Sequence, residues 1–375
     1  EGYGRVLAEE VRAAMDVPPF AKSPFDGYAF ISDDTRNATP ETPVVFTITE
    51  EIPAGKAPLF PVTHGTAAKI LTGAPVPEGA DTIIKYEETE FSPQWVKISE
   101  YIKPGNIVTV GEDVTAGTVL APKSTLITGA VMGVAAGQGI KSVTVYKKPL
   151  ISIVSTGTEL IDVGNPLPAG KIYSTNLFTL SGLLRDMGAE IRDGGSVTDG
   201  PDAISARISR ELEPADMVIT TGGASVGDYD FTQAAIEKAG GTMLFNKLDF
   251  KPGGSMMAGV RDGKVFLGLS GNPGAAAIGL MRIGAPYIRK LCGRGDIYYE
   301  AINVRLKKAV KKPSPKMRFL RGYLEVTDGQ AYFVENLSQG NGSVSSLLNC
   351  DLLGEIPKGA PALEAGTFIK AYRVK

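Results

Sequence analysis

The sequence predicts a multidomain α/β plus β protein, with a central, mostly parallel α/β/α sandwich, a β-rich insert domain and a small barrel-like β domain at the C-terminus. Three observations indicate this architecture. The 375 residues exceed what one ordinary hydrophobic core holds. Apolar strands alternate with helical patterns from residue 149 to residue 296. Outside that region, short alternating runs broken by glycine and proline are typical of β domains.

The composition argues against several classes of protein. Its 43% hydrophobic and 21% charged residues are those of a globular protein, and no apolar run is long enough to cross a bilayer. The net charge of −2 argues against nucleic acid as a partner, and we interpret the lysine-rich stretch 307–318 as a solvated edge. The one histidine and two cysteines argue against a Ser-His-Asp triad or a zinc site. We expect buried thiols in a reducing cytosol.

The N-terminal region combines a linker with the β-rich insert. Apolar residues at 7, 8 and 11 predict a short helix within residues 4–13, before Pro18 and Pro19. A proline-punctuated loop then leads, through a turn at Asp26, into an apolar stretch that ends at Phe30. We assign residues 1–43 and 109–148 to a linker domain and residues 44–108 to the insert. The expected elements are strands at 44–48, 67–71, 82–86 and 95–98, and a small-residue helix at 128–137.

The central domain, residues 149–296, alternates strands and helices. Strands are expected at 150–155, 190–193, 217–219, 243–245 and 264–269, and helices at 176–187, 201–212, 231–238 and after residue 274. In parallel sheets, ligands bind outside the carboxyl ends of the strands. The loops at Thr156, Thr198, Thr221 and Ser270 each follow a strand, so we expect them on one edge.

The C-terminal domain, residues 297–375, returns to short alternating runs. Strands are expected at 302–304, 318–324, 331–334 and 368–371, with one short helix within 343–349.

A glycine-rich loop follows the apolar strand at 217–219. Gly222, Gly223 and Gly227 precede a helical pattern, and such loops bring backbone N–H groups close to an anion. By itself the pattern is more typical of an ordinary strand-to-helix connection than of a phosphate site.

Carboxylates gather on the same expected edge. Glu159, Asp199, Asp228 and Asp230 follow its strands, and Lys251 precedes a Pro-Gly turn. Each acid alone is typical of a helix cap or a surface turn, and the lysine of a solvated side chain. Together they indicate a phosphorylated ligand held by backbone amides and a lysine, with Mg²⁺ bound by carboxylates. This favours metal-dependent chemistry on a phosphoester or an anhydride.

Several ordered motifs resemble one family over nearly the whole chain, namely the molybdopterin molybdenumtransferases, the molybdenum insertases that include bacterial MoeA and the E domain of gephyrin. The motifs are Ser23-Pro24-Phe25-Asp26-Gly27-Tyr28-Ala29, Thr72-Gly73-Ala74-Pro75, Gly111-Glu112-Asp113, Ser155-Thr156-Gly157-Thr158-Glu159, Gly222-Gly223-Ala224-Ser225-Val226-Gly227-Asp228-Tyr229-Asp230, Lys251-Pro252-Gly253, Gly271-Asn272-Pro273 and Arg318-Phe319-Leu320-Arg321-Gly322.

The resemblance implies a cytoplasmic homodimer, joined through its N-terminal linker domain, with a central domain of the molybdopterin-binding type. Such an enzyme takes adenylylated molybdopterin and molybdate and, with Mg²⁺, inserts the metal and releases AMP. The resemblance also implies an upstream adenylyltransferase and molybdoenzyme chaperones as partners.

The resemblance also implies functional roles for individual residues. Asp26, Thr72 and Asp113 match N-terminal positions that complete the site of the partner subunit. Glu159, Asp199 and Asp230 match central acids that bind the metal, and the catalytic set is these five acids with Lys251. The remaining substrate-binding positions are Ser155, Thr156, Gly157, Gly222, Gly223, Ser225, Gly227, Gly271, Asn272 and Pro273.

The chain departs from the family pattern at three places. Gly254 and Ser255 stand where bacterial members often have Lys-Pro, Ser270 replaces a proline, and Phe25 replaces a methionine. Two alternatives therefore stay open: a tungsten-preferring paralogue, and a non-catalytic molybdopterin carrier or scaffold of the same fold.

Overall fold

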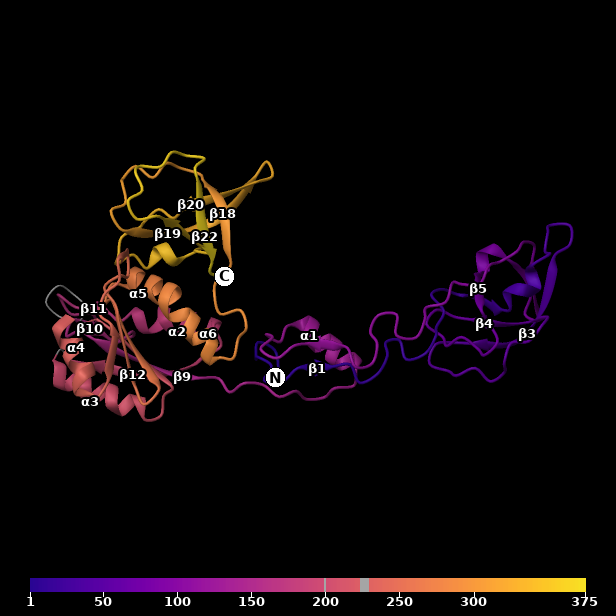
Figure 1. The fold of residues 1–375 in the computed structure, drawn as a ribbon, viewed down its shortest axis with the longest axis horizontal. Helices are drawn as coiled ribbons and strands as arrows, with labels where there is room; N and C mark the ends of the chain where they lie inside the picture. The colour runs from indigo at the N-terminus through magenta and orange to yellow at the C-terminus, as the bar shows by residue number, and fades with distance from the viewer. Residues whose placement is uncertain (199, 223–228) are drawn as a thin grey trace. The chain divides into compact units, whose positions relative to one another are not determined.

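The computed structural model describes residues 1–198, 200–222 and 229–375. The chain forms two compact units (Figure 1). The first contains Glu1–Tyr3, Glu9–Lys123 and Ile127–Thr144, and the second contains Gly4–Ala8, Ser124–Leu126 and Val145–Lys375. The four domain ranges given above remain predictions. Among the described residues, no helix is long and apolar enough to cross a membrane.

A six-stranded sheet forms the insert within the first unit. Its strands, in spatial order, are β5 (Thr82–Lys85), β2 (Gly27–Phe30), β4 (Thr66–Ile70), β3 (Val44–Ile52), β7 (Trp95–Ile98) and β6 (Glu90–Phe91). This confirms the four expected strands and adds two: β2, which lies between β4 and β5, and the short edge strand β6. Side chains alternate between the two faces of a strand, so Tyr28 and Phe30 enter one buried cluster and Ala29 enters another.

The predicted helix within residues 4–13 is wrong. Val6 and Leu7 form antiparallel bridges with Leu126 and Val145, and β1 (Val11–Arg12) pairs with β8 (Val119–Ala121). Pairing with segments far along the chain overrides the weak local helical spacing. The small-residue helix is confirmed as α1 (Gly129–Gly137).

The central domain contains a mixed sheet of six strands in the order β12, β9, β13, β17, β16 and β14. The first four are parallel, which confirms the mostly parallel prediction, whereas β16 is antiparallel to both of its neighbours. The strands are β9 (Leu150–Thr156), β12 (Glu190–Val197), β13 (Met217–Thr221), β14 (Thr242–Phe245), β16 (Met257–Arg261) and β17 (Lys264–Leu269).

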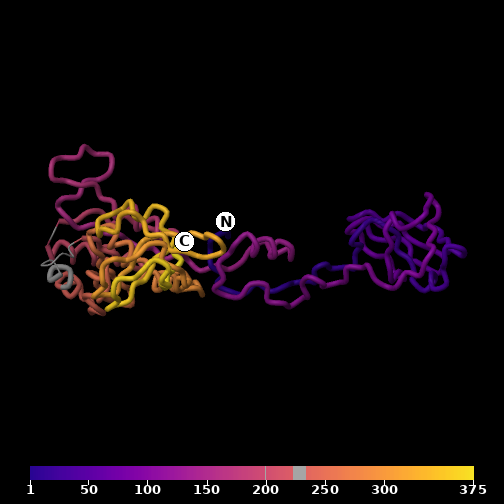
Figure 2. The backbone as a smooth tube through the Cα atoms, turned by 90° about the horizontal axis from the view of Figure 1, so that it is seen from above, coloured from indigo at the N-terminus to yellow at the C-terminus, as the bar shows by residue number. Residues whose placement is uncertain are grey.

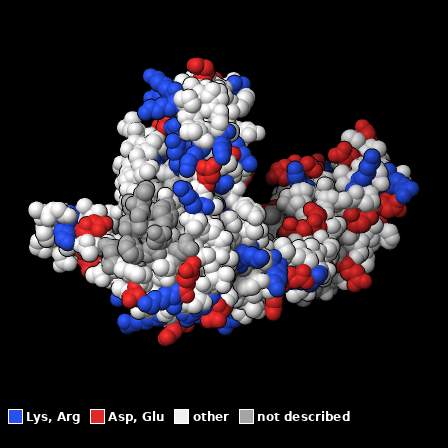
Figure 3. Space-filling model, turned by 60° about the vertical axis from the view of Figure 1, so that its left-hand side comes forward, with Lys and Arg blue, Asp and Glu red and all other residues white. Residues whose placement is uncertain are grey.

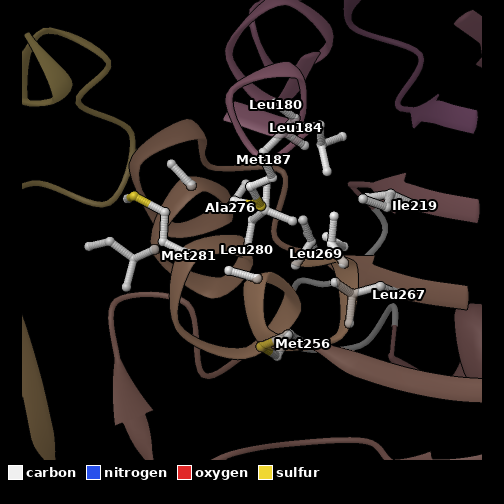
Figure 4. Packing of buried hydrophobic residues seen from close by; sticks show 14 of the residues in the cluster. Leu180, Leu184, Met187, Ile219, Met256, Leu267, Leu269, Ala276, Leu280 and Met281 are labelled. Carbon is white, nitrogen blue, oxygen red and sulfur yellow. The ribbon is translucent and has the colours of Figure 1, made fainter. Parts of the chain in front are cut away.

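Helices cover both faces of this sheet. On one face α2 (Asn176–Asp186), α5 (Pro273–Gly279) and α6 (Ala285–Leu291) pack on Ile219, Leu267 and Leu269 (Figure 4). A π-helical turn, Leu280–Gly284, joins the last two helices. On the other face lie α3 (Pro201–Leu212) and α4 (Tyr229–Lys238). Glu211 of α3 is buried there and accepts hydrogen bonds from Ser152 and Arg192, each 2.8 Å long.

The C-terminal domain is a closed barrel of five strands. In spatial order they are β19 (Met317–Thr327), β20 (Gln330–Glu335), β18 (Ala301–Leu306), β22 (Phe368–Arg373) and β21 (Leu352–Ile356), and β21 pairs back with β19. The barrel confirms the predicted class and adds β21. The expected helix within 343–349 is only a 3₁₀ turn, Ser345–Leu347.

The barrel and the sandwich share one core. Phe319 and Tyr372 of the barrel belong to the same buried cluster as Met281 and Ile288 of the helical layer. In addition, β15 (Phe250–Lys251) leaves the sandwich and pairs in parallel with β19. The shared core and this strand pairing therefore hold the loops of the two domains in place where the domains meet.

Candidate functional site

A cleft of about 1360 Å³ lies in the second unit, where the end of β13 and the loops after β9 and β17 meet the barrel. Residues 247–255 and barrel residues around 315, 341 and 358 complete its walls. A further wall is the segment with β10 (Leu160–Ile161) and β11 (Ile172–Tyr173), whose connecting loop stands out from the sheet (Figure 2). The volume is large enough for a nucleotide-sized ligand.

The loop after β9 brings a carboxylate to the cleft. Gly157 has φ +139°, and a Cβ there would lie 2.6 Å from Glu159 Oε2. Glycine at this position therefore lets the Glu159 carboxylate lie against the loop backbone. Thr156 Oγ1 donates a hydrogen bond of 3.2 Å to the Thr221 carbonyl oxygen, which joins this loop to the end of β13.

Gly222 forms a close backbone contact in the cleft floor. It has φ +98°, and a Cβ there would lie 2.2 Å from the Thr156 carbonyl oxygen. Its N–H donates to the Leu269 carbonyl oxygen at 3.3 Å. Only glycine allows the ends of β9, β13 and β17 to meet this tightly, so the floor consists largely of backbone.

The loop after β17 continues this floor. Gly271, Asn272 and Pro273 line the cleft, and Asn176 Nδ2 donates to the Gly271 carbonyl oxygen at 2.9 Å. Ser155 does not line the cleft, because its buried side chain lies inside the parallel ladder of β9 and β13.

Lysines line the side of the cleft that faces the barrel. Lys247 and Lys251 come from the segment around β15, and Lys316 and Lys358 come from barrel loops. Asp249 lies between the two barrel lysines and forms ion pairs with both. Hydrogen bonding to Lys358, followed by that to Lys316, lowers the pKa of Asp249.

Arg321 is buried directly behind a barrel loop of the cleft. Its side chain is fully buried, and it donates to the Gly340 carbonyl oxygen at 3.2 Å. Within the described residues its Nε and Nη1 groups have no hydrogen-bond partner. Burial lowers the pKa of this guanidinium. Asn341 and Gly342, which follow in this loop, line the cleft.

The N-terminal site residues lie in the first unit. One carboxylate oxygen of Asp26 accepts hydrogen bonds from both the N–H and the hydroxyl of Thr72, each 2.7 Å long. These bonds lower the pKa of Asp26, and the carboxylate is exposed. Asp113 is exposed in a turn, where its N–H donates to the Val17 carbonyl oxygen at 3.0 Å.

Several predicted site residues lie outside the described residues: Asp199, Gly223, Ser225, Gly227 and Asp228. The backbone of Asp230 is in α4, but its side chain is not described. Of the three expected metal ligands, only Glu159 can be placed in the cleft. The described part of the chain has no group of three or more His, Cys, Asp or Glu residues suited to a metal ion, so it provides no magnesium geometry.

Sequence reasoning did not single out four cleft residues: Asn176, Asn341, Lys316 and Lys358. Asn176 is the first residue of the helix that follows β11. An asparagine at the start of a helix near the expected ligand edge could have predicted this position. Lys316 falls in the stretch interpreted as a solvated edge. Its side chain is half-buried and lines the cleft. No local pattern distinguishes Lys358 or Asn341.

Comparison with known proteins gives consistent matches. Three family models match in order: "MoeA N-terminal region (domain I and II)" over residues 1–139, "Probable molybdopterin binding domain" over 152–290, and "MoeA C-terminal region (domain IV)" over 303–374. The chain is 33% identical to the molybdopterin molybdenumtransferase of Bacillus subtilis, covering 99% of this chain and 87% of that protein. It is 32% identical to that of Staphylococcus aureus strain MRSA252, covering 98% and 88%.

Solved structures agree with these matches. A crystal structure of the molybdopterin biosynthesis MoeA protein from Pyrococcus horikoshii superposes with a TM-score of 0.85 at 30% identity, covering 100% of this chain and 93% of that one. A second structure of the MoeA protein from this organism gives a TM-score of 0.84 at 28% identity.

Proposed function

The chain belongs to the molybdopterin molybdenumtransferase family, and from this membership we propose that it catalyses Mg²⁺-dependent insertion of molybdate into adenylylated molybdopterin with release of AMP. Membership of this family makes the protein a transferase of molybdenum cofactor biosynthesis. We propose the identity of the two substrates, of the metal ion and of the reaction products.

The observation that carries the proposal is the cleft itself. Its floor is glycine backbone at Gly157, Gly222 and Gly271, and its barrel side carries four lysines. Glycine backbone that a ligand can approach closely, together with ammonium groups, suits a ligand that bears phosphate groups. Lys251 would compensate the anionic charge of the phosphoanhydride, while the loops after β9, β13 and β17 hold the nucleotide portion.

Arg321 contributes positive charge behind the barrel loop that lines the cleft. Its guanidinium is fully buried and does not itself line the cleft, and no ion pair to it is found among the described residues. A nearby anion offsets the free-energy cost of burying a cation. This charge favours an oxyanion such as molybdate as the second substrate.

Magnesium would be held by carboxylate oxygens of Glu159, Asp199 and Asp230, which suit a hard cation. The ion would neutralise charge on the phosphoanhydride. The exposed carboxylate of Glu159 in the cleft supports this assignment for one of the three ligands.

A homodimer is part of the proposal. Helix α1 consists only of glycine, alanine, valine and methionine, yet Met132 and Val134 are each 43% exposed. An apolar helix with exposed side chains is typical of an interface. Asp26, Thr72 and Asp113 would then complete the site of the partner subunit. A cytoplasmic location and an association with the upstream adenylyltransferase and molybdoenzyme chaperones remain predictions.

The test incubates purified protein with adenylylated molybdopterin, molybdate and Mg²⁺, and measures AMP together with the ability of the product to activate a cofactor-free molybdoenzyme. We expect both signals, and we expect Glu159→Gln or chelation of Mg²⁺ to abolish them. Tight binding of the substrate without AMP release would instead favour the carrier or scaffold. Turnover with tungstate in strong preference to molybdate would favour the tungsten-specific alternative.

A further inference from the structure

Three charged side chains form a compact cluster where the barrel meets the cleft. One oxygen of Asp249 lies 3.4 Å from Lys316 Nζ, and the other forms an ion pair with Lys358 Nζ. All three residues line the cleft. The two lysines therefore converge on one carboxylate, as they would on a bridging anion.

The backbone fixes the two lysines side by side. Ser314 is fully buried, and its hydroxyl donates to the Lys316 carbonyl oxygen at 2.7 Å. The Gly359 N–H donates to the Ser314 carbonyl oxygen at 2.7 Å, and the Ser314 N–H donates to the Ala360 carbonyl oxygen at 2.8 Å. The turn that carries Lys358 is thereby fastened to the segment that carries Lys316.

The register of β15 on β19 places the carboxylate opposite these lysines. Phe250 pairs with Met317 and Lys251 with Arg318, so the preceding residues, Asp249 and Lys316, are also opposite each other. The anion comes from the sandwich and both cations come from the barrel. The cluster thus lies across the junction that borders the cleft.

The surrounding charge is positive. Lys247 and Lys251 also line the cleft, and neither has an ion pair with any residue that the structure describes. Lysines and arginines gather on the barrel surface in Figure 3. Against four ammonium groups, the described lining has only the carboxylates of Glu159 and Asp249.

The ion pairs with Asp249 are weak enough to exchange. The side chains of Asp249, Lys316 and Lys358 are 50%, 44% and 65% exposed. Exposed pairs contribute little to stability, because water screens them. A ligand with two or more negative charges competes well against a single carboxylate, since it attracts all the neighbouring ammonium groups at once.

We propose that Lys316 and Lys358 form a phosphate-binding subsite, and that Asp249 occupies the position of the phosphate until the ligand binds. The subsite would receive the phosphate groups of the adenylylated substrate, an identification that rests on the proposed function, whereas phosphate binding itself does not. Asp249 holds the two lysines in place and is displaced when the ligand binds.

The test is calorimetric titration of the full chain with pyrophosphate, AMP and molybdate at fixed ionic strength. Lys316→Gln and Lys358→Gln should each weaken pyrophosphate and AMP binding by about threefold, the usual scale for one exposed charge contact. Asp249→Asn should strengthen both by about threefold, because it removes the competing carboxylate. Lys307→Gln is the matched control, since Lys307 pairs with Glu325 at 2.8 Å on the same barrel but outside the cleft lining.

The Asp249→Asn variant separates the two roles of the cluster. If the ion pairs served only to join the barrel to the sandwich, this change would leave the affinities unchanged or weaken them, and that result would overturn the proposal. Shifts confined to molybdate would also overturn it, because they would assign the lysines to the free oxyanion. If the lysine variants bind pyrophosphate with unchanged affinity and AMP release is normal, the subsite is refuted and the proposed function stands. If the expected shifts in affinity occur but the protein releases no AMP, the subsite stands and the proposed function is refuted.

Discussion

Replacing Gly222 with alanine should destabilise the second unit and damage the cleft floor. Two costs add. An alanine at φ +98° is strained by about 1–2 kcal/mol. A Cβ that would lie 2.2 Å from the Thr156 carbonyl oxygen must push backbone away, and overpacking of this kind costs about 1–3 kcal/mol. The free energy of unfolding should therefore fall by about 2–5 kcal/mol.

Gly164 is a matched control, since it also has φ +98° but has nothing within 4 Å of the position of a Cβ. Gly164→Ala should lose only the conformational part, about 1–2 kcal/mol. The difference between the two variants isolates the close approach of Gly222 to Thr156. Substrate affinity should fall only in Gly222→Ala.

Urea unfolding followed by far-UV circular dichroism measures the loss. The single tryptophan, Trp95, lies in β7 of the first unit, so its fluorescence reports on a part of the chain that the substitution does not touch. We expect the tryptophan transition to stay in place while the dichroism transition moves to lower urea. Equal losses in Gly222→Ala and Gly164→Ala would refute the close approach of the two strand ends.

Three further predictions concern other parts of the molecule. Glu211→Gln should lower the free energy of unfolding by about 1–3 kcal/mol in urea titrations, because a buried acceptor of two hydrogen bonds is altered, and an unchanged value would contradict that network. Hydrogen bonding to Asp34 raises the pKa of His64, so the pair stabilises the fold below the unfolded pKa of histidine and that contribution is lost as the pH rises through the folded value. An NMR titration of this sole histidine should therefore show a raised pKa that Asp34→Asn returns to normal. If the sites are shared between subunits, mixing inactive Asp26→Asn and Glu159→Gln chains should restore about a quarter of the wild-type AMP release, whereas no recovery would argue against a shared site.

The strands and helices of the central domain could be predicted from the sequence because they have strong local hydrophobic patterns. The strand at 264–269 and the helix at 201–212 agree with β17 and α3 to the residue. Parallel pairing places the ends of β9, β12, β13 and β17 on one edge, as predicted for Thr156, Thr198, Thr221 and Ser270, although Thr198 does not line the cleft.

Elements that depend on distant partners were missed. Strand β2 is buried because β4 and β5 flank it, and nothing in its four residues distinguishes it from a loop that enters the core. The first residues were expected to be helical because their spacing fits a helix, but bridges to Leu126 and Val145 hold them extended. Such contacts follow from packing of the whole chain, which a local pattern does not encode.

The lysine side of the cleft could not be predicted for the same reason. Lys316 lies in a lysine-rich stretch without a helical or strand period, and Lys358 lies in an ordinary turn. They meet Asp249 only because β15 pairs with β19 and Ser314 fastens the turn. By contrast, Glu159 was predictable, since it comes three residues after the end of a buried strand and two residues after a glycine.

The most direct test of the central claim is the ratio of AMP released to molybdenum incorporated in a single turnover of adenylylated molybdopterin. The proposed function predicts one AMP for each molybdenum inserted, and neither product when molybdate or Mg²⁺ is left out. Substrate that binds but yields no AMP in the presence of both, or molybdenum incorporated without AMP release, would contradict it.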